Sequence, residues 1–217
     1  MPSNDICEIV VVRHGQTLAN RTGVLQGQYD TPLDEVGFAQ AEAIAERLKN
    51  EHFDAVYSSD LGRAMDTANT IVKYHPDLTV IPSEGLREWN LGDLQGKEYK
   101  DLLVQYPAIM DAFKSEGEVP PIPNGESLED FQNRVSGFMD RIAAENIGKR
   151  LLFVSHGGAT QRMFTHVTGP LKPGNIRPLC ANASLSVFQR RPAGWQLVAW
   201  NDISHLAHIK MHDTLTF

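Results

Sequence analysis

The sequence has no apolar run long enough to cross a membrane, and it does not open with the basic and apolar segments of a signal peptide. Cysteine is scarce, with only Cys7 and Cys180, and in a chain without a secretory signal we expect two buried thiols rather than a disulfide. No repeat or low-complexity linker divides the chain. These absences predict a cytoplasmic protein without a membrane partner, with residues 1–217 forming one domain.

Positive charge is also in short supply. The 20 lysines and arginines are outnumbered by 27 acidic residues, which gives a formal net charge of −7. This balance argues against a nucleic-acid partner, because such proteins present basic surfaces. If the protein binds anions, the site must be a local cluster of basic groups.

Two apolar segments end in the same unusual way. Ile9–Val12 is a run of four β-branched residues, as in a strand buried on both faces, and it is followed by Arg13 and His14. Leu151–Val154 forms a second apolar run, and His156 follows it one serine later. In open α/β sheets ligands bind beyond the carboxyl ends of the strands. We therefore expect the two imidazoles side by side at a ligand site.

The remaining pattern alternates between strands and helices, which predicts an α/β fold, a three-layer α/β/α domain with a mostly parallel central sheet. Thr31 is the expected N-cap of one helix, Asp60 of a second and Ser127 of a third. The expected helices cover residues 31–51, 60–74, 127 onward and 158–167, and the further strands cover 55–58, 79–81, 185–188 and 197–200. The last two strands read as a terminal hairpin or edge pair, whose exposed edge hints at a homodimer.

An insertion interrupts this alternation at about residues 95–126. It contains helical patches near 102–106 and 109–113, followed by a stretch with prolines at 120, 121 and 123 that excludes regular structure. We interpret it as a small helical cap over the carboxyl edge of the sheet.

Two arginines occupy positions that are unfavourable for a cation. Arg63 falls in the first turn of its helix, where the helix dipole repels positive charge and a bound anion would reverse the effect. Arg13 directly follows a buried strand, where an unpaired guanidinium is costly. The alternatives are a solvated Arg63 and a structural salt bridge at Arg13. Together with the two histidines, these arginines could neutralise a dianionic phosphoryl group.

Three residues could supply the chemistry of phosphoryl transfer. His14 is the candidate nucleophile, because Gly15 beside it leaves room for close approach and for backbone N–H donors. His156 would hydrogen-bond the phosphoryl oxygens, with a buried core histidine bonded to a carbonyl as the alternative. Glu88 lies among apolar residues that favour its protonated, proton-donating form; its alternative is a surface pair with Arg87.

Five blocks of sequence, in order along the chain, resemble the signature of the histidine phosphatase (phosphoglycerate-mutase-like) superfamily, and are most similar to its broad-specificity phosphatase branch. They are Arg13-His14-Gly15-Gln16-Thr17 with Asn20; Gln26-Gly27 with Thr31-Pro32-Leu33; Ser58-Ser59-Asp60-Leu61-Gly62-Arg63-Ala64 with Thr67-Ala68; Leu86-Arg87-Glu88 with Gly92-Asp93 and Gly96; and Ser155-His156-Gly157-Gly158. Together they span nearly the whole chain.

The resemblance implies a phosphoglycerate-mutase-like fold and a role for each matched residue. His14 is expected to be phosphorylated and Glu88 to be the general acid, and then the base for the water that cleaves phosphohistidine. The phosphate pocket is expected to combine Arg13, Arg63 and His156. Asn20 matches a phosphate contact, Gln26 and Gly27 match a substrate loop, and the glycines after the two histidines, Gly15 and Gly157, complete the expected phosphate site. No metal and no organic cofactor is implied.

The same phosphohistidine serves a phosphatase, which passes the phosphoryl group to water, or a cofactor-dependent phosphoglycerate mutase, which passes it to a second hydroxyl. Family mutases carry a longer insertion with extra arginines and a lysine. Here no arginine occurs between Arg87 and Arg134, and the acid-rich segment holds only the cations Lys97, Lys100 and Lys114. We therefore favour a hydrolase of small-molecule phosphomonoesters, with the mutase as the alternative.

Two other interpretations have less support. A metal hydrolase would use His205, His208 and His212, which lie at helical spacing, but no glutamate stands between them. A non-catalytic binding module would keep the fold without the chemistry, whereas here every expected reactive position is filled. The physiological phosphate ester is left open by the sequence.

Overall fold

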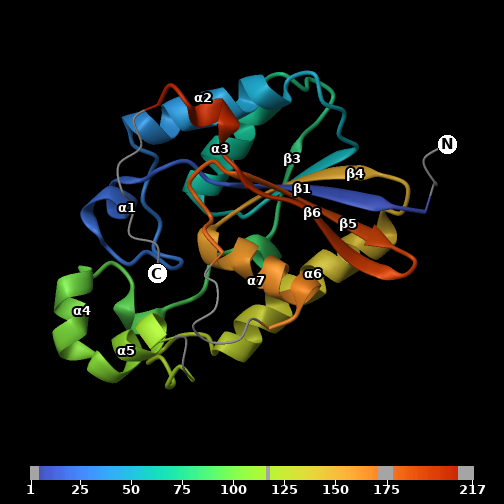
Figure 1. Ribbon diagram of the computed structural model, residues 1–217. Coiled ribbons are helices and arrows are strands. Elements are labelled where there is room, and N and C mark those ends of the chain that lie inside the picture. Colours follow the sequence, from blue (N-terminus) through green and yellow to red (C-terminus); the bar gives the residue numbers. More distant parts are fainter. Residues whose placement is uncertain (1–4, 116–117, 171–177, 210–217) are drawn as a thin grey trace.

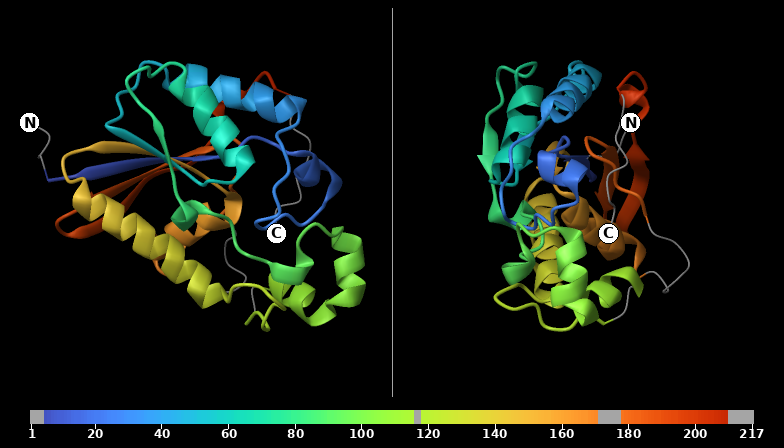
Figure 2. Two further views of the ribbon diagram at one scale, coloured as in Figure 1. Left: turned by 180° about the vertical axis from the view of Figure 1, so that it is seen from behind. Right: turned by 90° about the vertical axis from the view of Figure 1, so that its left-hand side faces the viewer.

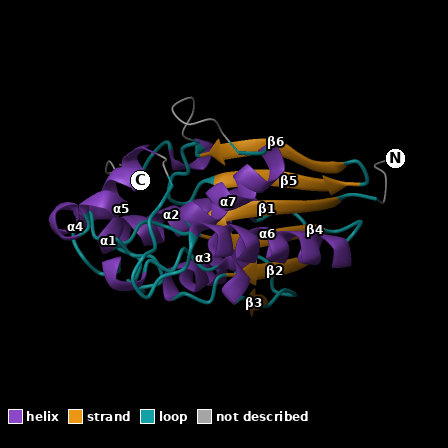
Figure 3. Cartoon of the chain, turned by 90° about the horizontal axis from the view of Figure 1, so that it is seen from below, coloured by secondary structure: helices purple, strands orange, loops and turns teal. Residues whose placement is uncertain are grey.

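The computed structural model describes residues 5–115, 118–170 and 178–209. Its centre is a six-stranded sheet with the order β3-β2-β4-β1-β5-β6, which Figure 3 shows across the molecule. The strands are β1 (Cys7–Arg13), β2 (Ala55–Ser58), β3 (Val80–Pro82), β4 (Arg150–Ser155), β5 (Leu185–Arg191) and β6 (Gly194–Asp202). Neighbours among the first four strands pair in parallel, and β5 pairs antiparallel with both β1 and β6. The sheet is therefore mostly parallel, as expected.

Helices cover both faces of this sheet (Figure 1). They are α1 (Leu18–Thr22), α2 (Glu35–Leu48), α3 (Gly62–Val72), α4 (Tyr99–Gln105), α5 (Pro107–Ser115), α6 (Leu128–Glu145) and α7 (Gly157–Thr168), with short 3-10 turns η1 (Glu84–Leu86), η2 (Gly92–Leu94) and η3 (Ser204–Leu206). α2 and α3 pack on one face and α6 and α7 on the other. The predicted three-layer α/β/α fold is confirmed.

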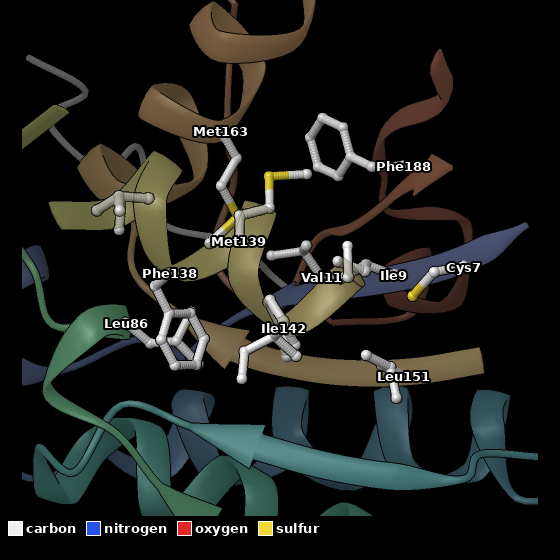
Figure 4. Packing of buried hydrophobic residues seen from close by; sticks show 14 of the residues in the cluster. Cys7, Ile9, Val11, Leu86, Phe138, Met139, Ile142, Leu151, Met163 and Phe188 are labelled. Atoms are coloured by element: carbon white, nitrogen blue, oxygen red, sulfur yellow. The ribbon is translucent and has the colours of Figure 1, made fainter. Parts of the chain in front are cut away.

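The two central strands explain why the sequence shows unbroken apolar runs. Along β1, Ile9 and Val11 point into the core under α6 and α7, and Val10 and Val12 point into the core under α2 and α3. β4 alternates in the same way. Figure 4 shows Ile9 and Val11 beside Met139 on the first of these faces. A strand covered on both sides needs apolar residues at every position.

The segment at 95–126 contains α4 and α5, which contain the two helical patches expected from the sequence. Both helices lie beyond the carboxyl end of β1, away from the body of the sheet (Figure 2). They close over an apolar cluster of their own, centred on Leu94, Leu102 and Met110, each with no exposed surface. This cluster anchors the segment over the edge where the two histidines end their strands.

Two predicted helix starts are wrong. Asp34, not Thr31, is the N-cap of α2: its carboxylate accepts from the Gly37 N–H at 2.8 Å, and the helix ends at Leu48 rather than at residue 51. Asp60 does not cap α3, which begins after Leu61 without a side-chain cap. In both cases another side chain has taken the expected cap: Gln26 binds Thr31 and Arg87 binds Asp60.

Other expectations hold. Ser127 caps α6, accepting from the Asp130 N–H at 3.0 Å, and β5 and β6 form the terminal hairpin with β6 at the edge. Cys7 and Cys180 are both buried and free, and burial raises the pKa of the Cys7 thiol to about 11. In the described part of the chain, no helix is long and apolar enough to traverse a bilayer.

Candidate active site

A cavity of about 510 Å³ opens at the carboxyl edge of the sheet. Its floor carries basic and acidic groups from distant parts of the chain: Arg13 and His14 at the end of β1, Arg63 on α3, Glu88, and the N-terminus of α7. The cap segment supplies an apolar wall. The edge where the sequence predicted a ligand is therefore a real pocket.

His14 is neutral and has a defined tautomer. Its Nδ1 lies 2.7 Å from the Gly15 carbonyl, which can only accept, so Nδ1 carries a proton, and Nε2 is the unprotonated nitrogen of the neutral ring. Burial, followed by the charges of Arg63 and Arg13, holds the pKa of His14 well below its usual value. An unprotonated imidazole nitrogen at the cavity is what a nucleophile requires.

His156 lies beside His14, with ring centroids 5.0 Å apart and planes at 62°. Both of its nitrogens are already bound: Nδ1 accepts from Nε of Arg63 at 3.2 Å, and Nε2 lies 2.8 Å from the Ser59 hydroxyl. The ring does not line the cavity among the described residues. The expected contact of His156 with a phosphoryl oxygen stays a prediction. The alternative, a core histidine bonded to a carbonyl, is wrong, because the ring nitrogens bond to Arg63 and Ser59.

Arg63 is 1% exposed, so the alternative of a solvated arginine is wrong. Burial lowers the pKa of its guanidinium, and Asp30, 3.2 Å away, offsets part of that effect. Nη1 also donates to the Tyr29 carbonyl at 3.1 Å, and Nη2 to the Gly27 carbonyl at 2.6 Å. With the bond to His156, these partners take four of its five N–H groups within the described residues, which leaves one on Nη2 for a ligand.

Arg13 is less fully bonded. Nη1 donates to the Cys180 carbonyl, whereas the buried Nε has no acceptor in the residues that the structure describes. No ion pair forms at Arg13 within that part of the chain, so a structural salt bridge does not explain its position. Gly157 makes room for it, since a Cβ there would lie 3.3 Å from the guanidinium. A buried guanidinium that has no carboxylate partner and lies beside a helix N-terminus can bind an anion.

Glu88 is held by two backbone donors. Oε1 accepts from the Trp89 N–H and Oε2 from the Gly158 N–H, each at 2.9 Å. The alternative of a surface pair with Arg87 is wrong, because Arg87 instead donates to Asp60, at 2.7 Å from its Nε. This pairing also explains why Asp60 does not cap α3. The carboxylate of Glu88 faces the cavity at a fixed position.

The expected substrate loop reaches the cavity. Asn20, Gln26 and Gly27 all line it. The Gln26 amide oxygen accepts from the hydroxyl of Thr31 at 2.7 Å, which is why Thr31 is not a helix cap. Gly27 has a φ of +54°, and a Cβ there would lie 2.8 Å from the Trp89 backbone oxygen, so the position favours glycine.

Gly15 serves a different purpose from the one expected. Its N–H donates to the Thr67 hydroxyl at 3.2 Å, and it does not line the cavity among the described residues. A Cβ at this position would lie 2.4 Å from the backbone oxygen of Gly37 on α2. The glycine thus allows α2 to approach the end of β1, and its N–H is not presented to a ligand.

The sequence did not identify most of the residues that line the cavity on the side where the alcohol part of a phosphate ester would bind. Phe113 lines it together with Trp89, and Gln161, Arg162 and Thr165 line it from α7. These last three follow Gly157 at helical spacing, a signal that the sequence did contain. The remaining apolar lining residues are Val24, Leu25, Leu91, Ala112, Val119, Leu128, Phe131, Pro170, Pro178 and Cys180.

The alternative of a zinc site on the C-terminal histidines finds no support in the described residues. His205 places Nε2 3.0 Å from the Ala183 carbonyl, and His212 lies outside the described residues. Within the described ranges, no three residues of the histidine, cysteine, aspartate or glutamate type are grouped to hold a metal ion.

A mostly parallel α/β sheet whose carboxyl edge presents an unprotonated imidazole, two buried guanidiniums and a carboxylate defines a phosphoryl-transfer enzyme. Comparison with protein families specifies which kind. The chain belongs to the histidine phosphatase superfamily (branch 1), whose family model matches residues 9–203.

Relatives within this superfamily are of both phosphatase and mutase type. A metal-independent phosphoserine phosphatase of Arabidopsis thaliana is 39% identical over 210 residues, which cover 95% of this chain and 86% of that protein. Phosphoglycerate mutase-like protein 4 of the same plant is 36% identical over 205 residues, covering 93% and 88%. The solved structure of Bacillus stearothermophilus YhfR superposes with a TM-score of 0.86 at 26% identity, covering 92% and 99%.

Proposed function

We infer that the protein hydrolyses small phosphomonoesters through a phosphohistidine on His14. In the first step the Nε2 lone pair forms a bond to phosphorus as the bond between phosphorus and the ester oxygen breaks. Glu88 gives its carboxyl proton to that oxygen, and a neutral alcohol leaves. The observation that carries the proposal is the unprotonated Nε2 of His14 in a cavity that also contains Glu88 and two arginines.

The second step returns the enzyme to its starting state. Glu88, now a carboxylate, takes a proton from a water molecule whose oxygen bonds to phosphorus, and the bond between phosphorus and Nε2 breaks. Inorganic phosphate leaves, and His14 is again neutral. Gly158 and Trp89 hold the carboxylate through both steps, since their N–H groups donate to its two oxygens.

The guanidiniums stabilise the charge on the transferred group. Arg13 offers its unpaired Nε and Arg63 the remaining N–H on Nη2, both from buried guanidiniums. In this proposal His156 orients Arg63. Asn20, Gln26, Gly27 and Gly157 complete the walls around the phosphoryl group.

Hydrolysis is favoured over mutase chemistry by the character of the cap wall. A mutase must retain an acidic intermediate, which requires cations around the leaving group. Here the cap contributes the apolar side chains of Ala112, Phe113 and Val119 to the cavity, and the cation on the leaving-group side is Arg162 from α7. The cap cation Lys97 lies over the Tyr106 ring at 5.0 Å, and Lys100 pairs with Glu98, so neither faces the cavity.

The same wall limits the substrate class. We expect alcohols with an apolar portion to fit the Trp89 and Phe113 side, and Arg162 on α7 to favour an anionic substituent on the opposite side. Phosphoserine, named for one relative, is a first compound to test.

The test is a hydrolysis panel of aryl, alkyl and amino-acid phosphates, with a mutase assay run beside it and a chelator present throughout. We expect phosphate release that is lost in His14→Ala and kept in the control His52→Ala, whose side chain is 80% exposed. An acid-labile phosphohistidine should form on the wild type. Transfer between substrate hydroxyls that far exceeds hydrolysis would overturn the proposal in favour of the mutase.

A further inference from the structure

Arg134 on α6 does not line the cavity among the described residues, yet all five of its N–H groups are bound. Nε and Nη2 donate to the two carboxylate oxygens of Glu126 at 2.8 and 2.9 Å. The other hydrogen of Nη2 goes to the Glu88 carbonyl at 3.0 Å. Nη1 donates to the carbonyls of Arg87 and Glu84 at 3.0 and 3.1 Å. With a longer contact to the Gly85 carbonyl at 3.5 Å, one side chain thus binds four carbonyls in the segment that ends in the proposed general acid.

Glu126 binds the other side of that segment. Its N–H donates to the Asn90 carbonyl at 2.8 Å, and its own carbonyl accepts from the Trp89 indole N–H, also at 2.8 Å. The carboxylate is 14% exposed and the Arg134 side chain 23%, so the ion pair is mostly withdrawn from water. Such a bidentate pair has one geometry, and its partners must occupy matching positions.

These contacts hold the backbone on both sides of Glu88. Its carbonyl accepts from Arg134 and from the Gln28 amide at 3.1 Å, and the neighbouring Trp89 is tied to Glu126. A carboxyl group transfers a proton efficiently only when it is at hydrogen-bond distance from the receiving oxygen. We propose that the Arg134–Glu126 pair is a positioning device that sets Glu88 for proton donation to the leaving oxygen.

This inference rests on the proposed function, because it assigns a purpose to Glu88. A positioning role for the Arg134–Glu126 pair differs from a purely structural role in one measurable respect. An ester with a poor leaving group, such as butyl phosphate, needs the proton from Glu88, whereas dinitrophenyl phosphate leaves as a stable phenolate without it. Loss of positioning should therefore affect the two substrates unequally, and general loosening of the fold should affect them alike.

The experiment compares kcat/KM on the two esters, since this ratio covers only the steps up to alcohol release. We expect Arg134→Gln to lower it about 30-fold on butyl phosphate and less than about 3-fold on dinitrophenyl phosphate. Arg134→Lys, which has three donors in place of five, should follow the same pattern. Glu88→Gln supplies the reference pattern, and Arg141→Gln on the same helix, with its side chain 59% exposed, is the matched control.

Glu126→Gln keeps the size of the partner side chain and tests the inference if Arg134→Gln does not fold. Competitive inhibition by inorganic phosphate should be unchanged in the variants, because it depends on Arg13 and Arg63. Equal losses on both esters, or no loss on either, would overturn the positioning role. A wild-type protein that hydrolyses neither ester would instead contradict the proposed function.

Discussion

Nε of Arg63 lies 3.2 Å from Nδ1 of His156, although 93 residues separate them in the sequence. A guanidinium can only donate, so Nδ1 of His156 must accept and its proton must be on Nε2, toward Ser59. The histidine is therefore neutral in this arrangement, in agreement with the lowering of its pKa by burial and by Arg63. The pair fixes the direction of the arginine and the tautomer of the imidazole at the same time.

Arg63→Lys tests this arrangement. Lysine keeps the positive charge but cannot reach His156, Gly27 and the ligand at once, because it lacks the planar fork of donors. We expect kcat/KM to fall about 100-fold and inhibition by inorganic phosphate to weaken. Arg47→Lys, at an exposed position paired with Glu51, should leave both unchanged. A variant with wild-type phosphate inhibition would contradict the role given to Arg63.

The rate should be insensitive to pH where an ordinary histidine titrates. Because the pKa of His14 is held well below 6.5, its Nε2 is already unprotonated at and below that pH. We expect no fall in kcat/KM on an aryl phosphate as the pH drops through about 6.5, once the ionisation of the substrate is allowed for. A loss of rate with a midpoint near that value would mean that His14 titrates normally.

The free energy of unfolding, unlike the rate, should change with pH in this range. The unfolded chain protonates its histidines near pH 6.5, whereas folded His14 and His156 resist protonation. The unfolded state therefore binds more protons below that pH, so the free energy of unfolding falls as the solution is acidified. Urea denaturation at about pH 7.5 and pH 5.5 measures the difference. His14→Gln should reduce it, and a stability that rises on acidification would contradict the burial argument.

Gly15→Ala tests the close approach of α2 to β1. The added Cβ would lie 2.4 Å from the backbone oxygen of Gly37, which cannot move without shifting the helix. We expect a loss of about 1–3 kcal/mol in the free energy of unfolding, measured with urea. Gly137→Ala in α6, where nothing lies within 4 Å, should instead stabilise by about 0.5–1 kcal/mol. Equal effects at the two glycines would refute the packing explanation.

Phe113→Ala tests the apolar wall of the leaving-group side. Removing the ring enlarges the cavity and takes away apolar contact, so kcat/KM for an aryl phosphate should drop about tenfold. The effect on a short alkyl phosphate should be small, since it does not reach that wall. Val104→Ala, at a position 82% exposed on the same cap, is the control. Equal losses of kcat/KM on both substrates would show that Phe113 does not contribute to substrate specificity.

Local sequence patterns predicted the fold well where they agreed with the tertiary contacts. The apolar runs of β1 and β4 are continuous because helices cover both faces, and Ser127 caps α6 as expected. The predicted helix starts at Thr31 and Asp60 failed because these residue types bond equally well to other partners. Thr31 binds Gln26, five residues before it in the same loop, and Asp60 binds Arg87, 27 residues later; a helix-capping pattern reveals neither contact.

The sequence by itself determined that two apolar strands end in histidine at the same edge of a sheet, because strand burial and direction follow from local hydrophobic patterns. Only the tertiary structure decided what those side chains meet: that His156 binds Arg63 and Ser59, and that Glu88 is held by a backbone N–H 70 residues away at Gly158. The physical reason is that a hydrogen bond is specified by the positions of two atoms. Those positions depend on packing across the whole chain and not on the residues beside them.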